Sequence, residues 1–203
     1  MLVNRAALGG NNNLQSLTVS SGTLSPVFNT NTTSYTVDVA SGVGSVTVAA
    51  QAQDAGASVS INGSITTSLL VTLGAAGTST PVTVIVTAPN STTKTYTVLV
   101  NRAALGGNNN LSALSISAGA LVPAFAASTT SYDVAAPNAT ASTTVTATVA
   151  DSAATLTING LPATSGVASA SIPLAIGANA IPVVVTAQNG TPKTYTITIT
   201  RAP

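Results

Sequence analysis

Small polar residues alternate with β-branched, aliphatic or aromatic ones along most of the chain. The alternation is clearest at residues 35–39 (YTVDV) and 194–200 (TYTITIT), and a helical period is nowhere sustained. A strand of this kind buries one face and exposes the other, as in an antiparallel sheet. In the first half of the chain the pattern predicts strands at residues 14–20, 34–39, 45–52, 58–62, 66–73, 81–88 and 93–100.

The second half of the chain repeats the first. Residues 2–14 read LVNRAALGGNNNL, and residues 99–111 read the same letters at an offset of 97. The offset is still 97 at the Asn-Gly pair of residues 62–63, and it is 99 in the last predicted strand. A net insertion of two residues therefore lies between Gly160 and Lys193 in the second copy.

The turn signals complete the fold prediction. The Asn-Gly pairs at residues 62–63 and 159–160 favour type I′ hairpins, in which both central residues need a positive φ. About seven strands in roughly 95 residues are typical of an immunoglobulin-like sandwich, so the sequence predicts an all-β protein of two tandem immunoglobulin-like antiparallel β-sandwiches. The expected parts are the tail of a preceding repeat plus linker at 1–13, repeats at 14–102 and 111–203, and a linker at 103–110.

The register of the repeat bears on both the start of the chain and its joint. Residues 2–5 match residues 99–102, so we expect a cut from a longer tandem array with Met1 as an added start; a native start with an unpaired strand is the alternative. The joint at 103–110 spans at most about 26–29 Å, and its Gly-Gly-Asn tract is flexible unless pinned. The identity of the two joints reflects either selected geometry or recent duplication.

A longer pattern also occurs in both copies. It begins Leu-x-x-Leu-x-(Val/Ile)-Ser-x-Gly-x-Leu-x-Pro-x-Phe at residues 14–28 and 111–125, and ends Lys-Thr-Tyr-Thr-(Val/Ile)-x-(Val/Ile)-x-Arg at residues 94–102 and 193–201. With a Tyr and the Asn-Gly pair between, this order resembles the bacterial cadherin-like β-sandwich repeat over nearly the whole chain. The resemblance implies a module of large surface or secreted bacterial proteins, located extracellularly or at the cell surface, with no catalytic residues to transfer.

Composition removes most chemistry. Charged residues make up 4% of the chain, and His, Cys and Glu are absent. Without imidazole, thiolate or paired carboxylates, the sequence predicts no enzyme, no cofactor and no zinc or disulfide framework. The four acidic residues are isolated, so a calcium-stiffened joint is not expected; they are Asp38, Asp54, Asp133 and Asp151.

Partners are restricted in the same way. A net charge of +1 gives no basic footprint for nucleic acid. No stretch of about 18 apolar residues could insert into a membrane. The expected partners are therefore neighbouring repeats of the same chain, with possible self-association into fibres or a lattice, because charges that guard sheet edges are almost absent.

Lysines recur at Lys94 and Lys193, and aspartates at Asp54 and Asp151. One hypothesis is an intramolecular Lys–Asn isopeptide bond, with a buried Asp as proton shuttle and a desolvated, neutral lysine amine as nucleophile. The favoured interpretation is a loop lysine before the final strand and an Asp that caps its own turn.

The remaining candidates are arginines and aromatic residues. An Arg ends each copy, and it either donates to carbonyls of a neighbouring domain or is a solvated charge of little weight; these are Arg5, Arg102 and Arg201. The aromatic residues fall at matched places, which favours core and corner positions over an exposed sugar-binding platform; they are Phe28, Tyr35, Tyr96, Phe125, Tyr132 and Tyr195.

These patterns predict a non-catalytic structural repeat, an extracellular stalk, spacer or fibre segment of a larger surface protein. The alternative is an adhesive or carbohydrate-binding module that recognises an unknown ligand through loops. A binding module requires a surface that differs between the copies, and the segments 64–80 and 161–179 differ most. A segment such as residues 2–5 could also add to an open sheet edge of a neighbour.

Overall fold

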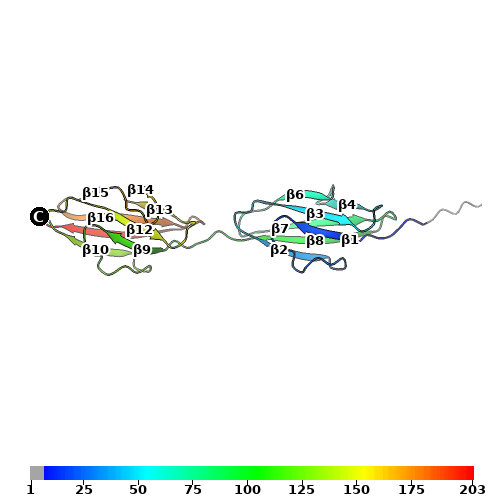
Figure 1. The fold of residues 1–203 in the computed structure, drawn as a ribbon, viewed down its shortest axis with the longest axis horizontal. Coiled ribbons are helices and arrows are strands. Elements are labelled where there is room, and N and C mark those ends of the chain that lie inside the picture. Colours follow the sequence, from blue (N-terminus) through cyan, green and yellow to red (C-terminus); the bar gives the residue numbers. More distant parts are fainter. Residues whose placement is uncertain (1–6) are drawn as a thin grey trace, which may run out of the picture. The chain divides into compact units, whose positions relative to one another are not determined.

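The computed structural model describes residues 7–203, in which all regular elements are strands (Figure 1). The chain divides into two compact units between Leu105 and Gly106. Each unit is a sandwich of β-sheets with its own hydrophobic core. The predicted fold class of two tandem immunoglobulin-like sandwiches is confirmed.

The first unit is built from two sheets that enclose one core. One sheet has the order β1-β3-β6 and the other β2-β8-β7-β4-β5. Inward side chains alternate with outward ones, as the pattern predicted: β2 reads exposed-buried three times over. The strands are β1 (Leu14–Val19), β2 (Ser34–Val39), β3 (Ser45–Ala52), β4 (Ser58–Ile61), β5 (Ser64–Ile65), β6 (Ser68–Thr72), β7 (Ser79–Thr87) and β8 (Thr93–Arg102).

The second unit repeats this plan. Its larger sheet has the order β10-β17-β16-β13-β14, while the other side consists of the pairs β12-β9 and β11-β15. The strands are β9 (Leu111–Ile116), β10 (Ser131–Ala136), β11 (Ser142–Thr143), β12 (Val145–Val149), β13 (Thr155–Ile158), β14 (Leu161–Ala163), β15 (Ile172–Pro173), β16 (Gly177–Thr186) and β17 (Pro192–Arg201).

Two features refine the predicted strand plan. The turns at residues 62–63 and 159–160 have positive φ at both positions, 48° and 83° in the first and 51° and 81° in the second, as type I′ hairpins require. Each turn opens a short extra strand, β5 or β14. One pair in each unit is parallel, β2 with β8 and β10 with β17, because the segment after β1 or β9 leaves its first sheet and joins the other.

The structure also locates the insertion. The amides of Leu73 and Leu174 donate to equivalent carbonyls, those of Gly44 and Ala141, both at 2.9 Å. Leu73 follows Gly63 by ten residues, whereas Leu174 follows Gly160 by fourteen. The second unit therefore gains four residues before Leu174 and loses two after it, which accounts for the net insertion of two.

The four added residues interrupt a strand. In the first unit, β6 pairs with β3 without a break from Ser68 to Thr72. In the second unit the equivalent segment keeps only separate backbone bonds to β12, from the amides of Gly166 and Ser169 to the carbonyls of Ala147 and Val145, and serine hydroxyls replace part of the ladder. The amide of Val145 donates to Ser169 Oγ at 3.0 Å, and the amide of Val149 donates to Ser165 Oγ at 3.0 Å.

Candidate functional site

The start of each unit is fixed by a buried tyrosine. Leu14 and Tyr96 are fully buried, and the Leu14 amide donates to the Tyr96 hydroxyl at 3.1 Å. The same hydroxyl donates to the carbonyl of Thr30 at 3.0 Å. In the second unit Leu111, Tyr195 and Ala127 repeat this arrangement, with distances of 3.1 and 2.9 Å.

A lysine covers this tyrosine and binds the residue before the first strand. Lys94 Nζ donates to Asn13 Oδ1 at 2.9 Å and to the Thr30 carbonyl at 2.8 Å, and it lies 5.1 Å from the centre of the Tyr96 ring. Oxygen acceptors and an aromatic face both stabilise a charged ammonium group. Lys94 therefore ties the incoming chain to β8.

The second unit contains the same cluster. Lys193 Nζ donates to Asn110 Oδ1 at 2.9 Å and to the Ala127 carbonyl at 2.7 Å, 5.0 Å from the Tyr195 ring centre. We call each set of four residues the N-terminal anchor: Asn13, Leu14, Lys94 and Tyr96 in the first unit, and Asn110, Leu111, Lys193 and Tyr195 in the second.

The structure thus pairs each lysine with an asparagine, but the aspartates of the isopeptide hypothesis lie elsewhere. Asp54 Oδ1 accepts from the Gly56 amide at 2.8 Å, and Asp151 Oδ1 accepts from the Ala153 amide at 2.9 Å. Each Asp caps its own turn, as the favoured interpretation expected. The lysines are half-buried strand residues with specific partners, so their interpretation as loop lysines was wrong.

The Gly-Gly-Asn tract is bound by the unit that follows it. The Gly9 carbonyl accepts from the Asn90 amide at 3.1 Å, and the Gly106 carbonyl accepts from the Asn189 amide at 3.0 Å. A Cβ atom added to Gly10 would lie only 2.8 Å from Asn90 Nδ2. The tract is therefore pinned to the unit that follows it.

Arginine fixes the other end of each unit. Arg102 donates from Nε to the Ser41 carbonyl and from a terminal nitrogen to the Gly74 carbonyl, both at 2.8 Å. Arg201 donates in the same way to the carbonyls of Asn138 and Leu174, at 2.9 and 2.8 Å; Asn138 matches Ser41, whereas Leu174 matches Leu73, the residue before Gly74. These acceptors lie within the arginine's own unit, an arrangement that neither sequence-based alternative anticipated. Arg5 and the tail at residues 2–5 lie outside the described residues.

The aromatic residues occupy core and corner positions, as predicted. The Tyr35 hydroxyl lies 2.7 and 2.8 Å from the carbonyl oxygens of Asn29 and Thr32, which share its single proton, and the Tyr132 hydroxyl lies in the same way between the carbonyls of Ala126 and Thr129. All four tyrosines are buried. Phe28 and Phe125 are half-buried and pack on Tyr35 and Tyr132 with ring centres 6.2 Å apart.

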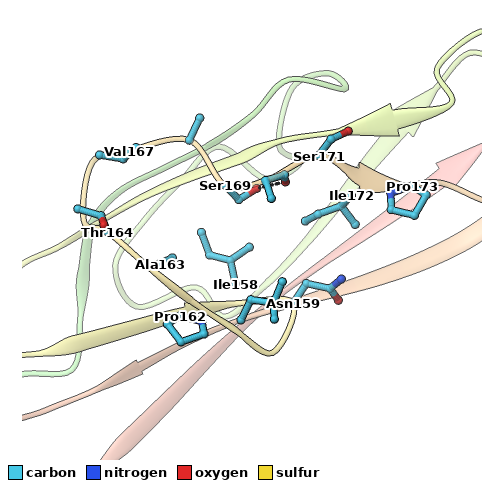
Figure 2. Close-up of a pocket in the computed structure, with 13 residues that line it drawn as sticks. Ile158, Asn159, Pro162, Ala163, Thr164, Val167, Ser169, Ser171, Ile172 and Pro173 are labelled. Atoms are coloured by element: carbon cyan, nitrogen blue, oxygen red, sulfur yellow. Dashed lines mark hydrogen bonds between the residues drawn. The ribbon is translucent and has the colours of Figure 1, made fainter.

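One cavity distinguishes the second unit. It has a volume of about 430 Å³ and lies between the β13–β14 hairpin and the loop that contains the four added residues. Figure 2 shows this loop, from Thr164 to Ser171, arching over Ile158. Its apolar lining includes Leu161, Val167 and Ile172; its polar lining consists of hydroxyls and the Asn159 amide, with no charged residue.

The side-chain carboxamide of Asn159 lacks a partner in the described part of the chain because of a single replacement. In the first unit Asn62 Oδ1 accepts from the Thr83 amide at 2.9 Å. In the second unit Pro182 stands in the place of Thr83. The backbone amide of Asn159 donates to the Pro182 carbonyl, just as the backbone amide of Asn62 donates to the Thr83 carbonyl. Proline has no N–H to donate. Within residues 7–203 the Asn159 carboxamide makes no protein hydrogen bond, so it is available at the cavity.

The family model for the cadherin-like beta sandwich domain matches residues 14–103 and 111–202. The chain belongs to this family. Cadherin-like β-sandwiches are typically non-catalytic, and a tandem pair indicates a structural or adhesion-type extracellular module. Among the described residues, no three His, Cys, Asp or Glu side chains cluster to hold a metal, and no helix is long and apolar enough to cross a membrane.

Similar proteins include one from Evansella cellulosilytica whose name assigns it provisionally to the membrane; it is 38% identical over 94 residues, 46% of this chain. The matched part is only 14% of that protein's length. Among solved structures, fibronectin(III)-like modules of Clostridium thermocellum CbhA match with a TM-score of 0.25 and 13% identity, over 92% of this chain and 95% of theirs. A protocadherin gammaB7 EC3-6 cis-dimer structure matches at 0.35 and 15%, over 87% and 47%.

The cadherin-like repeats should contain no isopeptide bond. Each lysine amine donates to two oxygen acceptors, and the carboxylate that such chemistry needs as a proton shuttle caps its own turn. Intact-mass spectrometry should therefore give the mass calculated from the sequence. A loss of about 17 Da per repeat, the mass of the ammonia that bond formation expels, would contradict this assignment.

Proposed function

We propose that this chain is a non-catalytic spacer, part of an extracellular stalk in a larger bacterial surface protein. The observation that carries the proposal is that both ends of each repeat are fixed to its own sandwich. The N-terminal anchor binds the incoming chain, and Arg102 and Arg201 bind carbonyls at the outgoing end. A stalk needs such fixed ends.

The joint supports the same role. The Ala103 amide donates to the Val39 carbonyl in the first unit, and Gly106 is bonded to Asn189 in the second. Between them, within the part of the chain that the structure describes, Ala104 and Leu105 make no hydrogen bond. A joint of eight residues in the sequence thus leaves two unanchored residues, which limits the loose chain that each repeat contributes to a stalk.

If copies of the chain self-associated, the spacer would instead be a segment of a fibre or lattice. The edge strands β1 and β9 contain no charged residue and no proline. Charges and prolines are the usual guards against edge-to-edge pairing. Shallow apolar grooves run beside these edges, lined by Leu24 and Phe28 in the first unit and by Leu121 and Phe125 in the second.

A small-angle scattering series over concentration separates the monomeric spacer from the fibre segment. We expect the mass to stay at 19.7 kDa at every concentration, because a spacer acts as a monomer. The matched control is the double variant Thr18→Lys and Ser115→Lys, which places a charge on the exposed face of each edge strand. Growth of the wild-type mass that this variant abolishes would contradict the monomeric spacer and make the chain a fibre segment joined through these edges.

A second candidate function, ligand binding by the second repeat, is favoured by its cavity. Its volume falls within the range of roughly 300–1,000 Å³ that small-molecule sites have. It lies in the segment where the repeats differ, which is where a binding module requires a difference. Its uncharged lining of hydroxyls, an amide and aliphatic groups suits a neutral ligand, and neutral oligosaccharides are the class that the alternative function implies.

This candidate is tested by chemical-shift mapping with cellotriose and chitotriose. Binding would shift the amides of residues 158–173 and leave the matching segment of the first repeat unchanged. The variant Val167→Trp, which adds bulk to an exposed lining residue, should then abolish the shifts. If neither sugar shifts these amides, or if both repeats respond alike, the cavity is not an oligosaccharide site.

A further inference from the structure

One strand in each repeat contacts both the incoming and the outgoing chain. In the first repeat this strand is β8, which starts at Thr93 and ends at Arg102. Lys94 and Tyr96, near its start, bind the two residues that open the repeat. Arg102, its last residue, leads directly into the joint. The chain therefore enters beside one end of β8 and leaves from the other.

The incoming contacts are specific and occur twice. The Asn13 carboxamide and the Leu14 amide bind two side chains of β8, and the Asn13 carbonyl accepts from the Gln53 amide after β3 at 2.9 Å. In the second repeat the carbonyl of Asn110 accepts from the Ala150 amide at the same distance. Force applied to the incoming chain is thus transmitted to both sheets of the sandwich.

The outgoing contacts fix the far end of the same strand. Besides the two bonds of the Arg102 guanidinium, the Ala103 amide donates to the Val39 carbonyl at 2.9 Å. In the second repeat the Ala202 amide donates to the Ala136 carbonyl at 2.9 Å, beside Arg201. These bonds continue the parallel ladder between the last strand and β2 or β10 beyond the strand itself.

The last strand of each repeat is hydrogen-bonded to a neighbouring strand along both of its edges. β8 pairs with β2 over six residues and with β7 over nine, and β17 pairs with β10 over six and with β16 over ten. Tension along the axis of such a strand loads all of these bonds at once, in shear. Tension across the strand breaks them one after another, so far less force is needed.

We infer that each repeat is built to carry tension along its last strand, with the N-terminal anchor passing force from the incoming chain to that strand. The inference rests on the proposed role as a stalk and adds a mechanical function to it. Lys94 and Lys193 are positioning residues in this scheme, since they tie the incoming chain to β8 and β17.

Constant-force unfolding of single molecules tests this. The chain contains no Cys, so Ala139→Cys gives a unique handle in the exposed loop after β10, at the end where β17 also terminates. Pulling between residue 139 and the C-terminus peels β17 from β10, whereas pulling from the two termini shears it. At equal force we expect the second repeat to unfold at least about tenfold more slowly in shear.

Two variants probe the anchor itself. Lys193→Met and Asn110→Ala each remove one partner of the bond between the incoming chain and β17, and the unchanged first repeat is the internal control. Pulled from the termini, the second repeat should unfold about tenfold faster in either variant, which corresponds to about 1.4 kcal/mol of barrier. Pulled from residue 139, its unfolding rate should be unchanged, because that path bypasses the anchor.

Equal rates in the two pulling directions would overturn the inference. So would variants that accelerate unfolding equally in both directions, since that is the effect of a residue that only stabilises the fold. Either result would leave the spacer role standing, because the scattering series decides that role through the mass in solution. Conversely, assembly into fibres would refute the monomeric spacer without changing the response of a single molecule to force.

Discussion

The buried amides of Leu14 and Leu111 are the constraint on which each repeat depends. A buried N–H without an acceptor costs about 1–3 kcal/mol, and strand β1 or β9 begins at this residue with no ladder partner on that side. The Tyr96 or Tyr195 hydroxyl accepts this hydrogen bond and donates its own proton to a loop carbonyl. The lysine and the preceding asparagine bond to each other beside that hydroxyl, and the glycine tract precedes them. The buried amide, its acceptor and these neighbours together fix the start of the domain.

Much of the fold follows from local sequence. The features that the sequence did not predict all depend on contacts between residues far apart in the chain. The alternation at residues 35–39 specifies a half-buried strand. The Asn-Gly pairs specify the β4–β5 and β13–β14 hairpins, because few other pairs tolerate two positive φ values. The bond between Lys94 and Asn13 joins residues 81 apart in the sequence, so neither residue reveals it. A Gly-Gly-Asn tract is indistinguishable from a flexible linker until Asn90 and Asp54 are packed against it. The insertion likewise separates into a gain of four residues and a loss of two only when Leu73 and Leu174 can be matched by their hydrogen bonds.

The two repeats share their N-terminal anchors and differ most in the segment before Leu174. Their anchors agree to within 0.1 Å at each bond, while the segment before Leu174 has opened a cavity and Pro182 has released the Asn159 amide. A module strung in tandem is constrained wherever the chain enters and leaves. Residues 161–171 make none of the anchor or arginine bonds, so this segment is free to change, and a ligand site would arise there without disturbing the stalk.

The central claim, that the joint residues belong to the fold of the repeat that follows them, is tested most directly by native-state hydrogen exchange. The amides of Leu14 and Leu111 should exchange only through global unfolding, with the same protection as those of Val98 and Ile197 in the central strands. The amide of Leu105, which has no hydrogen bond, serves as the unprotected reference. Exchange of Leu14 and Leu111 at the rate of Leu105 would show that the anchor does not form and would contradict the account.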